Sequence, residues 1–298
     1  MPVGIEIPQV RATDSPDPAE LASMLQQAEQ AGFHSAWAME PQLAPSSALE
    51  PLSVLAFAAA QTSSIRLGLA VAVLPLHQPV RLARQAATID HLTGGRFTLG
   101  VGVGVPALPH EAFGVKSTER APRFEEYLTV MRHLWEDEEV DFEGRFVTLR
   151  QARMEPKPIQ RPLPVWFGAG SSPALRRTAR LADGWIGAGS SPSSAFPKQL
   201  AELREYLEAE GRDPAQFPVA KRVYVAIDRP EGEVNAWFRA VYGPAITPEV
   251  AITGSLQQVL DGLHGLREAG ADLLVVAPVG DDRPQLDLVA EHVLPALG

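Results

Sequence analysis

Short apolar strand patterns alternate with longer helical patterns eight times along this chain of 298 residues. Runs of β-branched and apolar residues predict strands at 3–7, 34–39, 65–73, 96–104, 164–168, 185–189, 218–227 and 271–278. Apolar residues three and four apart predict the helices that come after them, at 18–32, 51–62, 79–95, 120–137, 172–184, 195–211, in a region ending with 255–270, and at 283–297. This alternation constrains the fold strongly, because parallel strands need crossover helices between them.

Eight such units in this length favour an α/β fold, a (β/α)8 TIM barrel, as one domain over residues 1–298. A doubly wound open sheet is the alternative. Residues 138–162 are polar and rich in proline, and we expect them to form an insertion after the fourth unit that lies over the barrel. Chemistry in a barrel is located at the C-terminal ends of the strands, so the loops after the strands are where a site is expected.

Composition excludes several classes of function. The formal net charge is −10 and no long basic run is present, which argues against a nucleic-acid partner. The absence of cysteine excludes disulfides and thiolate chemistry, and the scattered histidines form no metal motif. No apolar stretch reaches the ~20 residues of a membrane helix, and the start lacks the pattern of a secretory signal. We therefore expect a cytoplasmic protein that acts on a small molecule, without a metal.

One loop after a predicted strand has the chemistry of an anion site. Gly168-Ala169-Gly170-Ser171-Ser172 joins the strand at 164–168 to the next helix. Ser172 suits the N-cap and Pro173 the first helical position. The free N–H groups and the dipole of a helix start favour a phosphate. A plain turn with a serine cap is the alternative reading of the same residues.

Two other strand ends carry small residues. The sequence GVGVG, at 100–104, removes side chains where a flat molecule could approach, although a bulge or exit turn has the same composition. The sequence LAVAVLPLHQP, at 69–79, combines small residues with a histidine, and the alternative is a core strand. Lys221 lies within a predicted strand, where a Schiff-base lysine would fit, but its neighbours add no support.

Taken in order, several segments resemble the bacterial luciferase-like superfamily of flavin- and deazaflavin-dependent oxidoreductases. The resemblance rests on AEQAGFHSAWAMEP, RLGLAVAVLPLHQPVRLARQAATIDHLTGGRFTLGVGVG, EAFGV, PKPIQRPLPVWFGAGSSPALRRTARLADGW and LREAGADLLVVAP. These segments span nearly the whole chain. The family fold is the same barrel, with an insertion after the fourth unit.

The resemblance implies a cofactor and its binding residues. The family's cofactor phosphate sits at the helix start that matches Gly170, Ser171 and Ser172. Its flavin ring is backed by a non-prolyl cis peptide, which maps to Ala70-Val71. In the family, the edge of the ring has space at a strand end that corresponds here to Gly102, Val103 and Gly104. The branch that uses coenzyme F420 for hydride transfer is the most similar, and FMN, with oxygen chemistry and a partner flavin reductase, is the alternative. A homodimer is implied as well.

The acid or base of such a reaction is not fixed by the resemblance. Where the family often has a histidine after the second strand, Glu40 is followed by Pro41, and Val105 stands where several deazaflavin enzymes have a glutamate. We take Glu40 as a candidate acid, because a carboxyl group in an apolar pocket can have a raised pKa, with His77 as the second candidate. Glu40 paired with a nearby arginine, or capping a loop, is the structural alternative. The missing groups also leave open a cofactor-binding barrel that has lost catalysis.

Overall fold

The structure is a computed structural model that describes residues 1–12, 14–43, 46–105, 109–244, 246–280 and 283–298. Eight parallel strands form its central sheet, in the order β10, β9, β6, β5, β3, β1, β13, β11, and the pairing of β10 with β11 closes them into a barrel. Their bounds are Val3–Glu6 (β1), Ser35–Ala38 (β3), Arg66–Val73 (β5), Phe97–Gly102 (β6), Val165–Ala169 (β9), Gly184–Gly187 (β10), Val219–Ile227 (β11) and Leu273–Pro278 (β13). The expected (β/α)8 barrel is confirmed.

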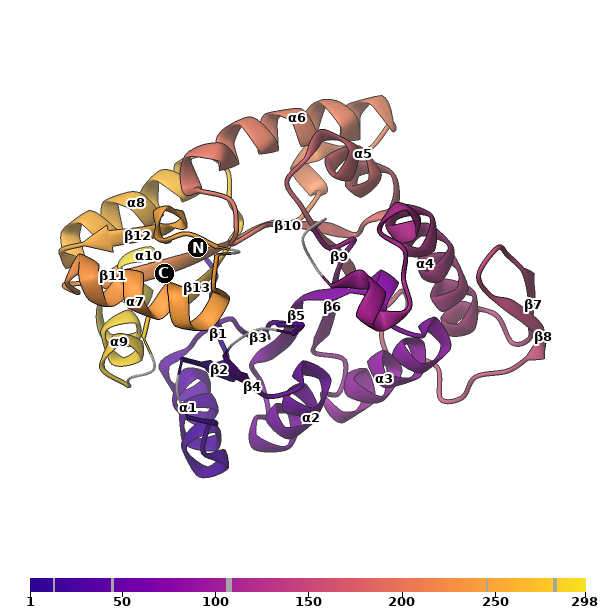
Figure 1. The fold of residues 1–298 in the computed structure, drawn as a ribbon, viewed down its shortest axis with the longest axis horizontal. Coiled ribbons are helices and arrows are strands. Elements are labelled where there is room, and N and C mark those ends of the chain that lie inside the picture. Colours follow the sequence, from indigo (N-terminus) through magenta and orange to yellow (C-terminus); the bar gives the residue numbers. More distant parts are fainter. Residues whose placement is uncertain (13, 44–45, 106–108, 245, 281–282) are drawn as a thin grey trace.

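Helices surround the barrel and alternate with its strands (Figure 1). They are α1 Pro18–Ala31, α2 Pro51–Gln61, α3 Pro79–Leu92, α4 Arg120–Glu136, α5 Ser172–Leu181, α6 Phe196–Ala209, α7 Glu231–Tyr242, α8 Leu256–Glu268, α9 Arg283–Leu288 and α10 Leu294–Leu297. Proline opens α1, α2 and α3, where its missing N–H costs no hydrogen bond. The last predicted helix is in fact α9 and α10 joined by a π-helical segment, Val289–Val293.

Three small pairings add to the barrel, and the sequence patterns did not predict them as strands. Strand β12, Ala251–Gly254, pairs with β11, and β2, Val10–Arg11, pairs with β4, Ser47–Ala48. The third is an antiparallel hairpin of β7, Val140–Glu143, and β8, Thr148–Ala152, inside the expected insertion. This hairpin projects from the outside of the barrel beside α4 (Figure 1), where Glu126 accepts hydrogen bonds from the amides of Phe146 and Val147. The expectation that it lies over the barrel was wrong, because these contacts hold it to a helix of the outer ring.

Two tryptophans fill the interior of the barrel. Trp37 on β3 and Trp166 on β9 have ring centroids 5.9 Å apart. A Cβ on Gly68 would overlap Trp37, and one on Gly184 would lie 2.7 Å from Trp166. Strand glycines are therefore the means by which the barrel accommodates these rings. The two tryptophans also line a hollow of about 550 Å³ at the N-terminal ends of the strands.

Among the described residues, no helix is long and apolar enough to cross a membrane. The same residues contain no group of three or more His, Cys, Asp or Glu side chains placed to hold a metal ion.

Candidate functional site

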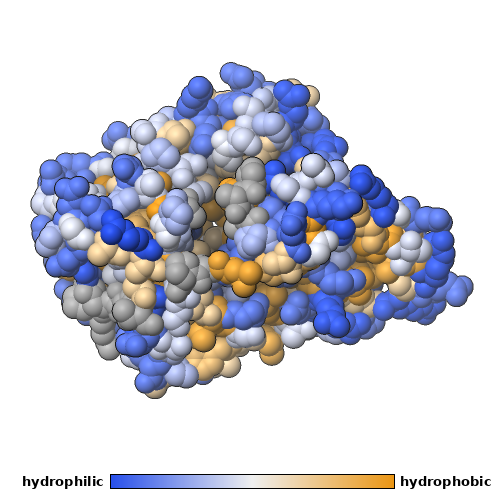
Figure 2. Space-filling model, in the orientation of Figure 1, coloured by the Kyte–Doolittle hydropathy of each residue, from blue (hydrophilic) through white to orange (hydrophobic). Residues whose placement is uncertain are grey.

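A cavity of about 730 Å³ lies at the C-terminal ends of β5, β6, β9 and β10, and Arg222 reaches it from the middle of β11. The surface is hollowed near the middle of the face shown in Figure 2. The lining is mostly apolar or small, and it combines nine of the residues that the sequence predicted for a cofactor: Ala70, Val71, Gly102, Val103, Gly104, Gly168, Ala169, Gly170 and Ser171. Residues from three separate loops are thus brought to one place, as a single bound molecule would require.

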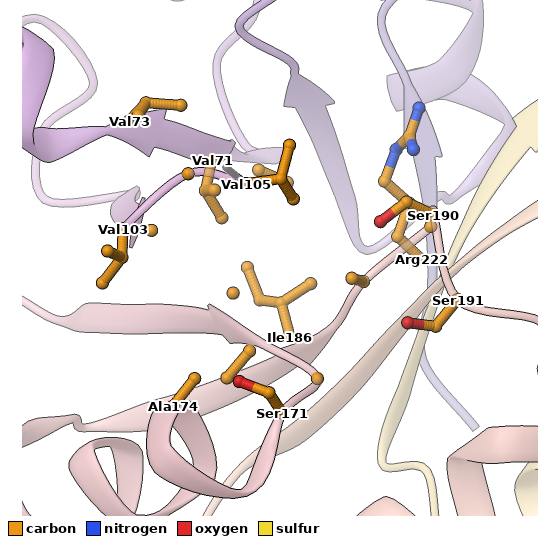
Figure 3. Close-up of a pocket in the computed structure, with 18 of the residues that line it drawn as sticks. Val71, Val73, Val103, Val105, Ser171, Ala174, Ile186, Ser190, Ser191 and Arg222 are labelled. Atoms are coloured by element: carbon orange, nitrogen blue, oxygen red, sulfur yellow. The ribbon is translucent and has the colours of Figure 1, made fainter. Parts of the chain in front are cut away.

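Valine side chains form one wall of this cavity (Figure 3). The Ala70–Val71 peptide bond is cis, at the position that the resemblance assigned, and the pairing of β5 with β6 shifts register there. A Cβ on Gly102 would lie 2.9 Å from Val71, and one on Gly168 would lie 3.0 Å from it. These two glycines therefore make room for the side chain of Val71, a protein contact, and not only for a ligand.

The start of α5 forms a second corner of the cavity. Ser171 is the N-cap and Ser172 the first helical residue, one position earlier than the sequence suggested. The side chain of Ser171 makes no capping hydrogen bond, Pro173 has no N–H, and the N–H of Ala174 donates to the carbonyl of Ser171 at 2.9 Å. Among the described first-turn N–H groups, that of Ser172 is therefore the one left for an anion. The indole N–H of Trp185 donates to the carbonyl of Ala169 at 2.9 Å and fixes the strand end that leads into the corner.

Ser172 lies on the other side of this helix start. It is not among the described residues that line the cavity, and its hydroxyl acts to lower the pKa of Glu202. It lines an adjoining hollow of about 400 Å³ together with three arginines, Arg176, Arg177 and Arg180, and two glutamates, Glu125 and Glu210. Arg177 lines both spaces and pairs with Glu125 at 2.9 Å. The α5 start therefore separates the main cavity from a hollow that is rich in arginine.

Glu40 and His77 form a pair behind the valine wall. Glu40 Oε2 accepts a hydrogen bond from the amide of Val73 at 2.6 Å, and its Oε1 lies 2.8 Å from His77 Nε2. Burial acts to lower the pKa of His77, but the hydrogen bond and the charge of Glu40, with Glu50, outweigh it and leave the pKa raised. Neither side chain is among the described cavity-lining residues. The pair is connected to the cavity by the hydrogen bond from the amide of Val73, a lining residue of β5, to Glu40. Their catalytic role stays a prediction.

Strand β11 supplies two buried cations. Lys221 Nζ donates to the carbonyls of Ala188, at 2.5 Å, and Ser191, at 3.0 Å. Burial, together with the charge of Arg222, lowers the pKa of Lys221 to about 7. Lys221 does not line the cavity in the described structure, whereas Arg222 does. Lys221 therefore holds the loop after β10 in place through these hydrogen bonds and does not present its amine to a ligand.

The sequence reasoning assigned no site residue to that loop, although 187–194 is one of the loops after a strand where a site was expected. Ala188, Gly189, Ser190 and Ser191 all line the cavity. A signal was present, since the sequence GAGSSP occurs at 168–173 and again at 187–192. The two copies come after neighbouring parallel strands, β9 and β10, so they meet at the same end of the barrel.

Comparison with known proteins agrees with this architecture. The family model described as luciferase-like monooxygenase matches residues 1–272. The chain belongs to the luciferase-like monooxygenase family. This luciferase-like chain is similar to an uncharacterised protein of Mycobacterium tuberculosis, 40% identical over 166 residues, which are 55% of this chain and 58% of the relative. It is also similar to an F420-dependent glucose-6-phosphate dehydrogenase of Kineococcus radiotolerans, 31% identical over 220 residues, 71% of this chain and 65% of the relative. Each match spans less than two thirds of the relative's own length.

Solved structures show the same fold over the whole luciferase-like chain. An F420-dependent secondary alcohol dehydrogenase superposes with a TM-score of 0.85 at 18% identity, covering 100% of this chain and 99% of that one. A monooxygenase, RslO1 of Streptomyces bottropensis, superposes with a TM-score of 0.82 at 25% identity and covers 100% of both chains. Family membership places the chain among the luciferase-like oxidoreductases, whose members include deazaflavin-dependent and monooxygenase enzymes.

Proposed function

We propose that this protein is an F420-dependent oxidoreductase that transfers a hydride to or from a small organic substrate. The observation that carries the proposal is the single cavity in which the cis peptide at Val71, the α5 start at Ser171 and the loop at 188–191 meet. One cavity thus offers both a surface for a flat ring and a seat for its phosphate.

The residues present fit such a cofactor. Ser171 and the guanidinium groups of Arg120 and Arg177 lie along the cavity, and these guanidinium groups with the N–H of Ser172 at the α5 start would hold a phosphate. Arg120 donates to the carbonyls of Ser117 and Gly104, which keeps its charge at the cavity rim. Val71, Val103 and Ile186 offer apolar contact to a ring. When bound, the deazaflavin supplies a carbon that gives or accepts hydride.

Two features favour F420 over FMN. The relative with the longer match is named as an F420-dependent dehydrogenase. The arginine-rich hollow next to α5 would also suit a cofactor that continues beyond its phosphate with acidic groups, as F420 does and FMN does not. Glu125 pairs with Arg177 and Arg180, whereas Arg176 lies over the ring of Tyr206 and forms no ion pair within the described parts of the chain.

FMN-dependent monooxygenation is the second candidate, because the family is named for monooxygenases and the monooxygenase RslO1 shares the fold over its whole length. A flavin reductase would then be a partner. A homodimer is expected in either case from the resemblance alone. Glu40 and His77 are proposed as the groups that influence proton transfer, acting through the strand end at Val73.

The test is a fluorescence titration of the purified protein with F420 and, separately, with FMN. We expect F420 to bind at micromolar concentration or tighter and FMN to bind at least ten-fold more weakly. Preference for FMN would replace hydride transfer by oxygen chemistry, and binding of neither would overturn the proposal. Tight binding of F420 without turnover on any substrate would support a barrel that has lost catalysis.

A matched pair of variants tests the phosphate seat. Ser171→Asp adds a negative charge beside the proposed phosphate, while Ser255→Asp makes the same change at the N-cap of α8. Aspartate is a good N-cap, so both variants should fold. We expect Ser171→Asp to weaken cofactor binding at least ten-fold and Ser255→Asp to leave it unchanged. Equal affinities would show that the α5 start is only a turn.

A further inference from the structure

The cavity has charged side chains on two sides, and Arg120 is the one without an ion pair among the described residues, since Arg177 pairs with Glu125. Among the described residues that line it, the charged side chains are arginines: Arg120, Arg177 and Arg222. Arg120 and Arg177 lie on α4 and α5, on the side of the proposed phosphate seat. Arg222 comes from β11 and lies with Ser190 and Ser191 across the cavity from the valine wall (Figure 3). With the cofactor phosphate at α5, the substrate is left with the Arg222 side.

The charge of Arg222 is neutralised within the protein. Its Nε and Nη2 each lie 2.5 Å from Oε2 of Glu6, at the end of β1. Both side chains are largely buried, with exposed fractions of 7% and 13%. A buried pair of this kind has a net charge of zero, so this side of the cavity offers no net attraction to an anion.

The guanidinium also has few hydrogen-bond donors to spare. Nε donates to Glu6, Nη2 faces Glu6 and the sulfur of Met39, and Nη1 donates to the hydroxyl of Tyr224 at 2.8 Å. A guanidinium has five N–H groups, so one N–H, on Nη1, is left after these partners. Recognition of a carboxylate or phosphate by arginine typically uses two parallel N–H groups. A single N–H suits a single oxygen.

The position of the spare N–H is fixed by its surroundings. A Cβ on Gly189 would overlap Nη1, so this nitrogen lies against the glycine of the loop that lines the cavity. The guanidinium carbon lies 4.4 Å from the centre of the Tyr224 ring, which holds the group from its other face. Beside Arg222, Ile186 and Ile246 give this side apolar surface, and Ser190 and Ser191 are its neutral polar residues.

We propose that the substrate is a neutral, largely apolar molecule with one carbonyl or hydroxyl oxygen that accepts a hydrogen bond from Arg222. This inference rests on the proposed function, because it assigns the α5 side of the cavity to the cofactor. It sets this chain apart from an enzyme for a sugar phosphate, which needs a second uncompensated cation for the substrate. The same charges apply with F420 or FMN, since both place a phosphate at α5.

The test uses three probes of similar shape on the protein loaded with F420: cyclohexanone, cyclohexanecarboxylate and cyclohexyl phosphate. Binding is measured by titration calorimetry, which needs no turnover. We expect cyclohexanone to bind at least ten-fold more tightly than either anion. Tighter binding of an anion, or no binding of cyclohexanone, would overturn the inference. Failure of F420 to bind in the fluorescence titration would instead overturn the proposed function, and the probes would then be tested with FMN-loaded protein.

Two variants separate charge from donor number. Glu6→Gln removes the compensating charge, and we expect binding of cyclohexanecarboxylate to improve at least ten-fold. Tyr224→Phe frees a second N–H without changing the charge, and we expect an improvement of about three-fold. Glu143→Gln, at an exposed pair with Arg150, and Tyr127→Phe, whose hydroxyl accepts from Arg123, are the matched controls and should change nothing. If Glu6→Gln does not fold, the relative affinities of the three probes in the wild type and in Tyr224→Phe still test the inference. An unchanged affinity for cyclohexanecarboxylate in a folded Glu6→Gln variant would contradict the charge argument.

Discussion

The same six residues, GAGSSP, adopt two different structures in neighbouring loops of this barrel. At 168–173 the serines open α5 directly, with Ser171 as the N-cap. At 187–192 they form a turn that continues into a short 3-10 helix, Ser193–Ala195, before α6 begins at Phe196. The difference comes from the residues next along the chain, because ALRRTARL continues a helix at once, whereas SSAF delays it. A glycine–serine loop is thus defined by its neighbours as much as by its own residues.

The two loops also differ in how they are held. The second is anchored from below by Lys221, whose ammonium group donates to two of its carbonyls inside the barrel wall. The first is held by Gln199, whose amide donates to the carbonyl of Gly170 at 3.0 Å near the surface. We therefore expect the second loop to depend on a buried, titratable group and the first to tolerate change.

The largest expected effect comes from Lys221. Its pKa is lowered from 10.5 to about 7 in the folded protein, so between these values the unfolded chain binds more protons than the folded one. The free energy of unfolding should therefore rise as the pH increases from 7 towards 10, by up to about 5 kcal/mol, with no further change below pH 7 from this group. Lys221→Met should remove this rise. Urea unfolding at several pH values measures it.

Lys198→Met is the matched control, because Lys198 is exposed on α6 and its loss should leave the pH dependence as in the wild type. Because the result is the difference between the two variants, the contribution of tyrosines that titrate at high pH to the free energy of unfolding cancels. A rise with pH that survives in Lys221→Met would mean that this lysine is not the group that titrates. The hydrogen bonds that hold the second loop would then not depend on pH in the way proposed.

The second glycine of each loop gives the next effect. A Cβ on Gly189 would overlap Nη1 of Arg222, which is held by Glu6 and cannot easily retreat. A Cβ on Gly170 would lie 3.2 Å from Ser191 Oγ and from Gln199 Nε2, both of which can shift slightly. Gly189→Ala should cost about 2 kcal/mol of stability and Gly170→Ala less than about 1 kcal/mol. Urea unfolding of the two variants at one pH checks this order, and a reversed order would show that the arginine is free to move.

Sequence patterns could predict most of this fold because strands and helices depend on local periodicity. The helix at 79–95 was expected and α3 covers Pro79–Leu92, and a strand at 65–73 was expected and β5 covers Arg66–Val73. The short strand β12 was missed because AITG is too short to show a period. The nine lining residues from Ala70 to Ser171 belong to three segments that their own composition had made candidates, and the resemblance assigned the three segments to one cofactor.

Contacts made by closing the barrel lay beyond the reach of sequence patterns. Glu6 and Arg222 are 216 positions apart and meet only because β1 and β11 are both neighbours of β13. The link from Lys221 to the 188–191 loop depends in the same way on the pairing of β10 with β11. Periodicity assigned both cations to a strand, but only the three-dimensional arrangement shows that one faces the loop and the other the cavity.

The smallest expected effect, Gln199→Ala, sharpens the comparison between the loops. The hydrogen bond from Gln199 to Gly170 is exposed, so water can replace it, and its loss should cost less than about 0.5 kcal/mol of stability. The α5 start would keep its N–H groups in place, because the helix itself orders them, and affinity for F420 should fall less than three-fold. Lys221→Met should reduce the same affinity more, since Ala188 and Ser191 lose a buried donor. Fluorescence titration of both variants at pH 7 compares them directly. A greater loss of affinity in Gln199→Ala would mean that the first loop, and not the second, depends on its external support.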